Sequence, residues 1–198
     1  MIDSIEYEAP TWNQIYKMLL KQSEKIYKSR YHPDIIVGIA RGGIIPTSVL
    51  TDLLKIYQVA IIRVEFYRGI DKPSMQPVIT RPLNVTVENK KILIVDDISD
   101  TGQSLKIVKH HLIEKGAMEI KIATLYTKPT TQTLPDYFEK MTDHWVVFPW
   151  ELKETLQDIL QKQKDKQAIH NEFVKLVQAG LPKQFLQQIL KTLQGSQM

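Results

Sequence analysis

Apolar residues in this 198-residue chain form short continuous runs that alternate with stretches in which they recur every three or four positions. The runs at 34–40, 60–67, 92–95 and 120–127 have the length of strands, and those at 34–40 and 92–95 read as strands buried on both faces. Helical spacing recurs over 11–29, 44–54 and 105–112. This alternation predicts an α/β fold with a twisted, mainly parallel sheet flanked by helices.

The C-terminal quarter has a different pattern. Residues 135–141 are predicted to form a loop, and residues 143–151 a final aromatic-rich strand and turn. After them, residues 151–166 and 183–193 carry leucines at helical spacing among Gln, Lys and Glu, with Gly-Leu-Pro at 180–182 between them. We therefore predict two domains, an α/β domain over 1–151 and a helical extension over 152–198.

Two of the predicted strands run into short glycine-containing loops that precede helices. One loop follows the strand at 34–40 and the other follows the strand at 92–95. Because the carboxyl ends of parallel strands meet at one edge of a sheet, both loops are expected to face one crevice. Glycine lets the backbone approach a ligand closely, and the first N–H groups of a helix lack partners within the helix, so each loop suits an anion such as phosphate.

Two adjacent acids, Asp96 and Asp97, follow the apolar run at 92–95. Two carboxylates repel a phosphate, so they suit either the hydroxyls of a sugar or a divalent cation. The sequence has no G-x-x-x-x-G-K-[ST] motif, which removes the main support for a nucleoside triphosphatase. An ordinary buried strand followed by a capped helix remains the alternative for this segment taken by itself.

Composition narrows the class of protein. With 43% hydrophobic and 24% charged residues the chain reads as globular, and without cysteine it has neither disulfides nor thiolate metal sites. The N-terminus lacks the apolar core of a signal peptide and no run is long enough to span a membrane, so a cytoplasmic protein is expected. The net charge of +4 is mild, and the lysine-rich run at 162–166 is typical of a solvated helix face, so nucleic acid is not expected as a partner.

An apolar strand, two acids and then D-T-G-x-S resembles the signature of the type I phosphoribosyltransferases, which bind 5-phosphoribosyl pyrophosphate (PRPP). The resemblance implies that Asp96 and Asp97 bind the ribose and Mg²⁺. It implies a 5′-phosphate loop formed by Asp100, Thr101, Gly102, Gln103 and Ser104. It also implies a pyrophosphate loop formed by Ala40, Arg41 and Gly42, with a cis peptide bond between Ala40 and Arg41.

The Lys128-Pro pair and the segment W-V-V-F-P-W-E at 145–151 resemble the 6-oxopurine branch of this family, most closely the bacterial xanthine-guanine enzymes. In that branch Lys128 would donate to the purine 6-oxo group, Trp145 would stack on the base, and the backbone carbonyl of Val146 would accept from it. Glu151 would help to hold a second Mg²⁺.

The resemblance implies a purine salvage enzyme that transfers the phosphoribosyl group of PRPP to hypoxanthine, guanine or xanthine. Asp100 would accept the purine proton, and Lys128 would stabilise the oxo group. A flexible lid that begins at Tyr67 and Arg68 would close over the site. Mg²⁺ as cofactor and a homodimer or homotetramer are further implications.

Some positions depart from the family. Gln103-Ser104 stands where glycine or lysine is followed by threonine, and Val147 replaces a polar residue, which leaves the preference at the purine 2-position open. The alternative function is a regulator that senses PRPP and binds nucleic acid, in keeping with the basic charge and the C-terminal helices. Asp100, together with the base-pocket residues Lys128 and Trp145, favours the enzyme.

Overall fold

The structure, a computed structural model, describes residues 5–68, 75–163 and 165–195. Contacts divide the chain into two compact units: Tyr16–Asp143 form one, and Met1–Ile15 with His144–Met198 form the other. Each unit is described by itself below.

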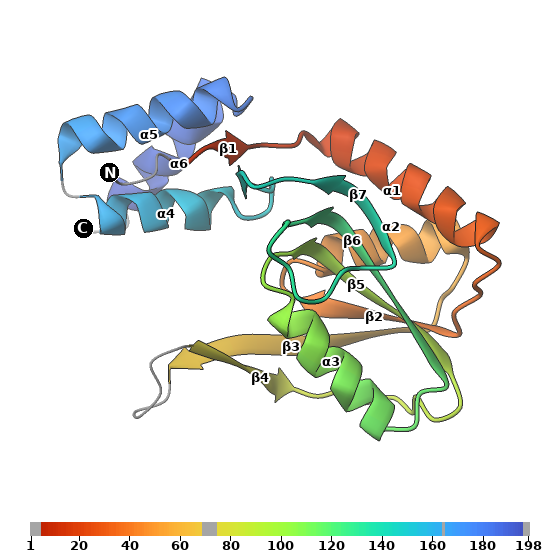
Figure 1. The fold of residues 1–198 in the computed structure, drawn as a ribbon. Helices are drawn as coiled ribbons and strands as arrows, with labels where there is room; N and C mark the ends of the chain where they lie inside the picture. Colours follow the sequence, from red (N-terminus) through yellow and green to blue (C-terminus); the bar gives the residue numbers. More distant parts are fainter. Residues whose placement is uncertain (1–4, 69–74, 164, 196–198) are drawn as a thin grey trace. The chain divides into compact units, whose positions relative to one another are not determined.

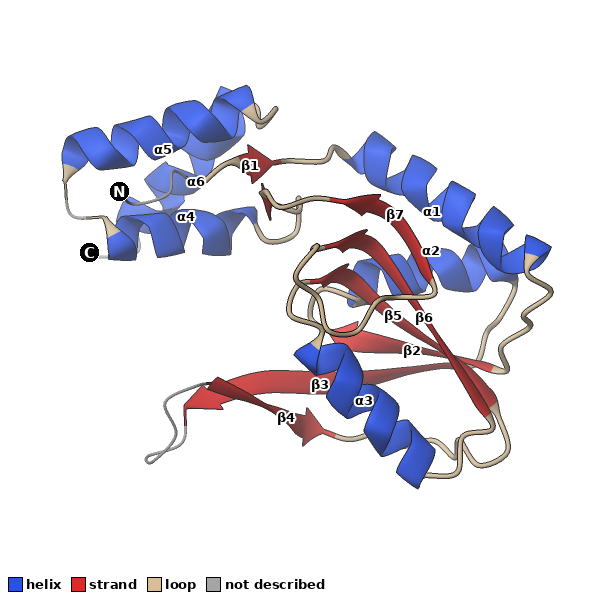
Figure 2. Cartoon of the chain, in the orientation of Figure 1, coloured by secondary structure: helices blue, strands red, loops and turns tan. Residues whose placement is uncertain are grey.

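The unit of residues 16–143 is built on a twisted sheet whose described strands have the order β4-β3-β2-β5-β6-β7 (Figures 1 and 2). Neighbouring strands are parallel except for β3 and β4, which are antiparallel. The strands are β2 (Ile35–Ala40), β3 (Val59–Arg68), β4 (Met75–Arg81), β5 (Lys91–Ser99), β6 (Glu119–Thr127) and β7 (Tyr137–Met141). The predicted fold class is therefore confirmed.

Helices cover both faces of this sheet because its central strands are apolar on both sides. In β2, Ile35, Ile36 and Val37 are fully buried although successive side chains point to opposite faces. Helix α2 (Ile44–Leu54) packs against β2 and β5, and α3 (Gln103–Glu114) packs on the other face (Figure 1). Helix α1 (Trp12–Lys28) runs beside β6 and β7, where Gln22 donates to the Thr124 carbonyl oxygen at 2.7 Å.

Two predicted boundaries were wrong. Strand β5 continues through both acids to Ser99, because it stays hydrogen-bonded to β6 as far as the pair Ser99 and Thr127. Residues 137–141, predicted as loop, form strand β7, which pairs in parallel with β6. Strand β7 is at the sheet edge and carries two exposed residues at its end, so its sequence lacks the apolar run of a central strand.

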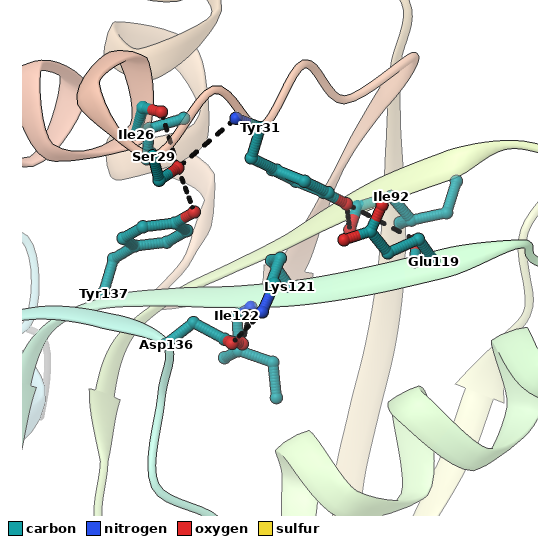
Figure 3. Close-up of polar contacts among 9 residues, drawn as sticks. All are labelled: Ile26, Ser29, Tyr31, Ile92, Glu119, Lys121, Ile122, Asp136 and Tyr137. Atoms are coloured by element: carbon teal, nitrogen blue, oxygen red, sulfur yellow. Dashed lines mark hydrogen bonds and ion pairs between the residues drawn. The ribbon is translucent and has the colours of Figure 1, made fainter.

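A buried tyrosine in the segment between α1 and β2 contacts the amino ends of β5 and β6. The hydroxyl of Tyr31 donates to the carbonyl oxygen of Ile92 at 2.7 Å and lies 3.4 Å from that of Glu119 (Figure 3). Burial raises the pKa of Tyr31, with a smaller contribution from the charge of Glu119. Tyr31 therefore remains a protonated donor at neutral pH, and it fixes the sheet edge opposite the carboxyl ends of the strands.

We expect Tyr31→Phe to lower the free energy of unfolding by about 1–3 kcal/mol, because it leaves a buried carbonyl oxygen without its donor. Chemical denaturation of the two proteins measures this difference. Tyr57→Phe is the matched control, since the Tyr57 side chain is 78% exposed, and it should leave the unfolding free energy unchanged. Equal stability of Tyr31→Phe and the wild type would contradict the prediction.

The second unit combines a short sheet with the C-terminal helices. Strands β1 (Tyr7–Glu8) and β8 (Trp145–Val146) pair in parallel, and α4 (Leu152–Lys162), α5 (Lys166–Gln178) and α6 (Lys183–Gly195) share an apolar core. Tyr7 ties β1 to α5 by donating to Glu172 at 2.5 Å. The appended helices are confirmed, and the predicted domain boundary at residue 151 stays a prediction. None of the described helices has the length and apolar character of a membrane span.

Candidate active site

Three loops leave the same edge of the main sheet. Strands β2, β5 and β6 are consecutive parallel neighbours, so the segments that follow Ala40, Ser99 and Thr127 begin side by side. These segments contain the two glycine loops and Lys128. The convergence predicted from the sequence is confirmed for these three loops.

The first loop joins β2 to α2 and carries the predicted pyrophosphate-binding residues. The peptide bond between Ala40 and Arg41 is cis, as predicted. The Arg41 side chain is exposed, whereas Gly42 lies so close to the carboxylate of Asp97 that an added Cβ atom would overlap it. The loop and strand β5 are therefore in direct contact, and glycine is the residue that permits this contact.

Asp96 and Asp97 lie within β5, and both are largely buried, with 9% and 5% of their surface exposed. The backbone N–H of Asp97 donates to Oδ1 of Asp96 at 3.0 Å. Successive residues of a strand point to opposite faces, so Asp97 lies on the face that carries Gly42 and α2, and Asp96 on the face that carries α3.

The second loop joins β5 to α3. Gly102 precedes α3 with φ of +78°, a left-handed conformation that favours glycine, and α3 begins at Gln103. The Gly102 carbonyl oxygen accepts from the N–H of Lys106, so the helix starts directly after the loop. The first-turn N–H groups beside Asp100 and Thr101 therefore form the end of a helix suited to an anion.

Lys128 follows β6, and hydrogen bonds hold both its backbone and the end of its side chain. Its backbone N–H donates to the carbonyl oxygen of Ser99 at 2.8 Å, and its Nζ donates to the carbonyl oxygen of Asp143 at 3.0 Å. The first bond brings Lys128 beside the predicted 5′-phosphate loop. Sequence reasoning missed Ser99 and Asp143, because a backbone carbonyl leaves no mark on the residue type that supplies it.

The predicted lid begins at the end of β3. Tyr67 is 53% exposed and donates to Glu65 at 2.7 Å, a bond that lowers the pKa of Glu65 and raises the pKa of Tyr67. The backbone of Arg68 ends the strand. Residues 69–74 lie outside the described residues, so the lid stays a prediction.

The remaining predicted site residues belong to the other unit. Within the strand and turn predicted over 143–151, only Trp145–Val146 form a strand, β8, which pairs with β1 and not with the main sheet. Trp145 is 50% exposed, Val146 is buried, and Glu151 occupies the N-cap position of α4 without a side-chain capping hydrogen bond. An exposed indole face suits stacking on a base, but the roles of Trp145, Val146 and Glu151 stay predictions.

Two glycine-containing loops, two buried acids and a lysine at the carboxyl edge of a parallel sheet are typical of α/β proteins that bind a phosphorylated sugar or a nucleotide. The chain belongs to the phosphoribosyl transferase domain family, which it matches over residues 11–155.

Similar proteins agree with this assignment. The chain is 32% identical to a xanthine-guanine phosphoribosyltransferase of Nitratidesulfovibrio vulgaris over 145 residues, which cover 71% of this chain and 82% of the relative. It is 28% identical to the Gluconobacter oxydans protein of the same name over 75% of this chain and 86% of the relative. The crystal structure of a purine phosphoribosyltransferase from Pyrococcus horikoshii superposes with a TM-score of 0.68 and 40% identity, covering 74% of this chain and 94% of that one. The resemblance to the 6-oxopurine branch is confirmed.

Proposed function

We propose that this chain is a purine salvage enzyme that transfers the 5-phosphoribosyl group of PRPP to a 6-oxopurine and releases diphosphate. The observation that carries the proposal is the convergence of the Arg41 loop, the Asp96-Asp97 pair, the Gly102 loop and Lys128 on one sheet edge. The names of the similar proteins, which are xanthine-guanine and purine phosphoribosyltransferases, support the purine as acceptor.

Each group of residues has a part in the proposed reaction. The N–H groups of Asp100–Ser104 bind the 5′-phosphate, and the Arg41 loop binds the diphosphate. As the bond from the anomeric carbon to diphosphate breaks, positive charge develops on the ribose ring, and the carboxylates of Asp96 and Asp97 hold its hydroxyls. A purine imidazole nitrogen then bonds to the anomeric carbon.

Proton transfer and base recognition fall to Asp100 and Lys128. The purine nitrogen loses its proton when it attacks, and in this proposal the carboxylate of Asp100, which is exposed, accepts it. Lys128 donates to the 6-oxo group, where negative charge builds up as the proton leaves, and such charged hydrogen bonds contribute about 1.5–3 kcal/mol. Trp145 stacks on the base and the Val146 carbonyl accepts from it in this proposal.

The residues present fit Mg²⁺ that arrives with PRPP. Within the part of the chain that the structure describes, no group of three or more His, Asp or Glu side chains is placed to hold a metal. Mg²⁺ commonly binds one or two carboxylates together with substrate phosphates and water, and the carboxylates of Asp96 and Asp97 supply the protein's share. Bound there, the ion would neutralise the charge of the departing diphosphate. Glu151 as a ligand of a second ion, and a homo-oligomeric assembly, are further parts of the proposal.

Diphosphate release tests the function. With PRPP and Mg²⁺, we expect release with hypoxanthine, guanine or xanthine, and rejection of adenine by roughly 10⁴-fold in kcat/KM, because its amino group offers the lysine a donor in place of an acceptor. Lys128→Met should lose most of this rate, whereas Lys109→Met, an exposed lysine on α3, should keep it. Comparable turnover of adenine and hypoxanthine would contradict the base assignment. No release of diphosphate with any base would favour the alternative function, a regulator that senses PRPP.

A further inference from the structure

A segment after Lys128 lies directly against the 5′-phosphate loop. A Cβ atom added to Gly102 would lie 2.6 Å from the backbone nitrogen of Thr133 and 2.7 Å from Oγ1 of Thr131. Real Cβ atoms do not approach other atoms so closely. No side chain therefore fits between the phosphate loop and residues 131–133. Because the two segments are closely packed, a movement of one displaces the other.

Two side-chain hydroxyls join these segments. Oγ of Ser99 lies 2.7 Å from Oγ1 of Thr131 and donates to the carbonyl oxygen of Thr133 at 3.1 Å. One hydrogen-bond chain satisfies all three atoms if Thr131 donates to Ser99 and Ser99 donates to Thr133. Ser99 is 1% exposed, so water does not replace this arrangement. We call the Ser99 and Thr131 side chains the hydroxyl bridge.

Backbone hydrogen bonds surround the hydroxyl bridge on both sides. The N–H of Lys128 donates to the Ser99 carbonyl oxygen at 2.8 Å, and the N–H of Gln132 donates to that of Thr101 at 3.1 Å. Residues 128–132 are thus held at each end by residues 99–101, which lead into the phosphate loop. The lysine that the proposed function assigns to the base is the first residue of this held segment.

We propose that Ser99 and Thr131 are positioning residues that couple the 5′-phosphate loop to Lys128, so that a bound PRPP molecule fixes the lysine for the purine. This proposal rests on the proposed function and names residues of that site. A phosphate bound to the loop stabilises one conformation of the loop. The hydroxyl bridge forms in that conformation, and it thereby holds residues 128–132 in the matching position. The enzyme with PRPP bound then binds the purine more tightly than it would without the bridge.

The test separates purine binding from PRPP binding. Thr131→Val removes the bridging hydroxyl and keeps the shape of the side chain, and Thr131→Ser keeps the hydroxyl. We expect Thr131→Val to raise the KM for hypoxanthine at saturating PRPP by about 5-fold or more, the lower end of typical coupling between sites. In Thr131→Val the Kd of PRPP, measured by calorimetry with Mg²⁺ and without a base, should change less than about 2-fold. Thr131→Ser should restore the KM for hypoxanthine.

Further variants show whether the two hydroxyls act as one unit. Ser99→Ala should reproduce the effect of Thr131→Val, and the double variant should be no worse than either, because residues that share one interaction are not additive. Thr127→Val is the matched control, since its buried hydroxyl has no hydrogen-bond partner among the described residues and lies beside Lys128 in the chain. It should keep the KM for hypoxanthine.

The outcomes are distinct. A purely structural role would lower the folded fraction and hence the apparent kcat, and would leave both constants unchanged. An unchanged KM in Thr131→Val, or an equal defect in Thr131→Ser, would overturn the coupling while the proposed function stands. A wild-type protein that turns over no purine would overturn the proposed function and, with it, this proposal.

Discussion

Replacing Gly42 by alanine should lower kcat/KM for PRPP by about 10²-fold, because misplacing a catalytic group by about 1 Å has an effect of that size. The added methyl group would overlap the Asp97 carboxylate, which lies 5% exposed against the glycine. The overlap is with side-chain atoms of Asp97 and not with backbone, so we expect the carboxylate to shift, the fold to survive and the proposed ribose contact to be lost. Steady-state kinetics at saturating purine and a thermal unfolding curve measure the two effects separately.

Gly38→Ala is the informative control for this experiment. The three nearest atoms to its added methyl group belong to the Thr47 side chain on α2, whose hydroxyl it would overlap, and to the Ile61 side chain, whose Cδ1 lies at 2.9 Å, and none of them to Asp97. We expect it to lower the free energy of unfolding by about 1–3 kcal/mol, as overpacking does, and to leave kcat/KM per folded molecule unchanged. Wild-type kinetics for Gly42→Ala would show that Asp97 has no part in PRPP binding.

The central strands of the main sheet could be predicted from the sequence because they are apolar on both faces. Strand β2 and residues 92–95 of β5 are continuous apolar runs, and each strand leads through glycine into a helix, so their parallel pairing followed from general rules. Strand β7 was missed because an edge strand with polar residues has no such run. Trp12 shows another limit of the pattern: it lies in a segment with the helical spacing of apolar residues, yet it is 55% exposed and contacts Trp150, which is distant in sequence.

Residues of the candidate site could be predicted where the local structure requires one particular residue type. Gly42 and Gly102 are required by a close contact and a positive φ, and the cis bond before Arg41 followed from the family resemblance. The contacts that hold Lys128 were not predictable, because the carbonyl groups of Ser99 and Asp143 belong to segments that meet only in the folded chain. The hydroxyl bridge between Ser99 and Thr131 spans 32 positions and has no local pattern.

Asp100 is the residue whose proposed task is most easily separated from binding. It lies exposed between β5 and Gly102, in the loop whose N–H groups are proposed to bind the 5′-phosphate. Asparagine has nearly the same size and shape, so Asp100→Asn should keep the backbone of the loop and hence the phosphate contacts. It does not accept a proton at neutral pH, so the proton of the attacking purine loses its acceptor.

Asp100→Asn should therefore lower kcat by roughly 10²–10⁴-fold, the usual contribution of a general base, while the Kd of PRPP with Mg²⁺ changes little. Single-turnover kinetics with preformed enzyme–PRPP complex measure the chemical step, and calorimetry measures the affinity. Asp52→Asn, an exposed acid on α2, removes the same charge away from the loops and should leave both values unchanged. An unchanged rate in Asp100→Asn would remove it as proton acceptor, whereas a parallel loss of PRPP affinity would assign it to phosphate binding instead.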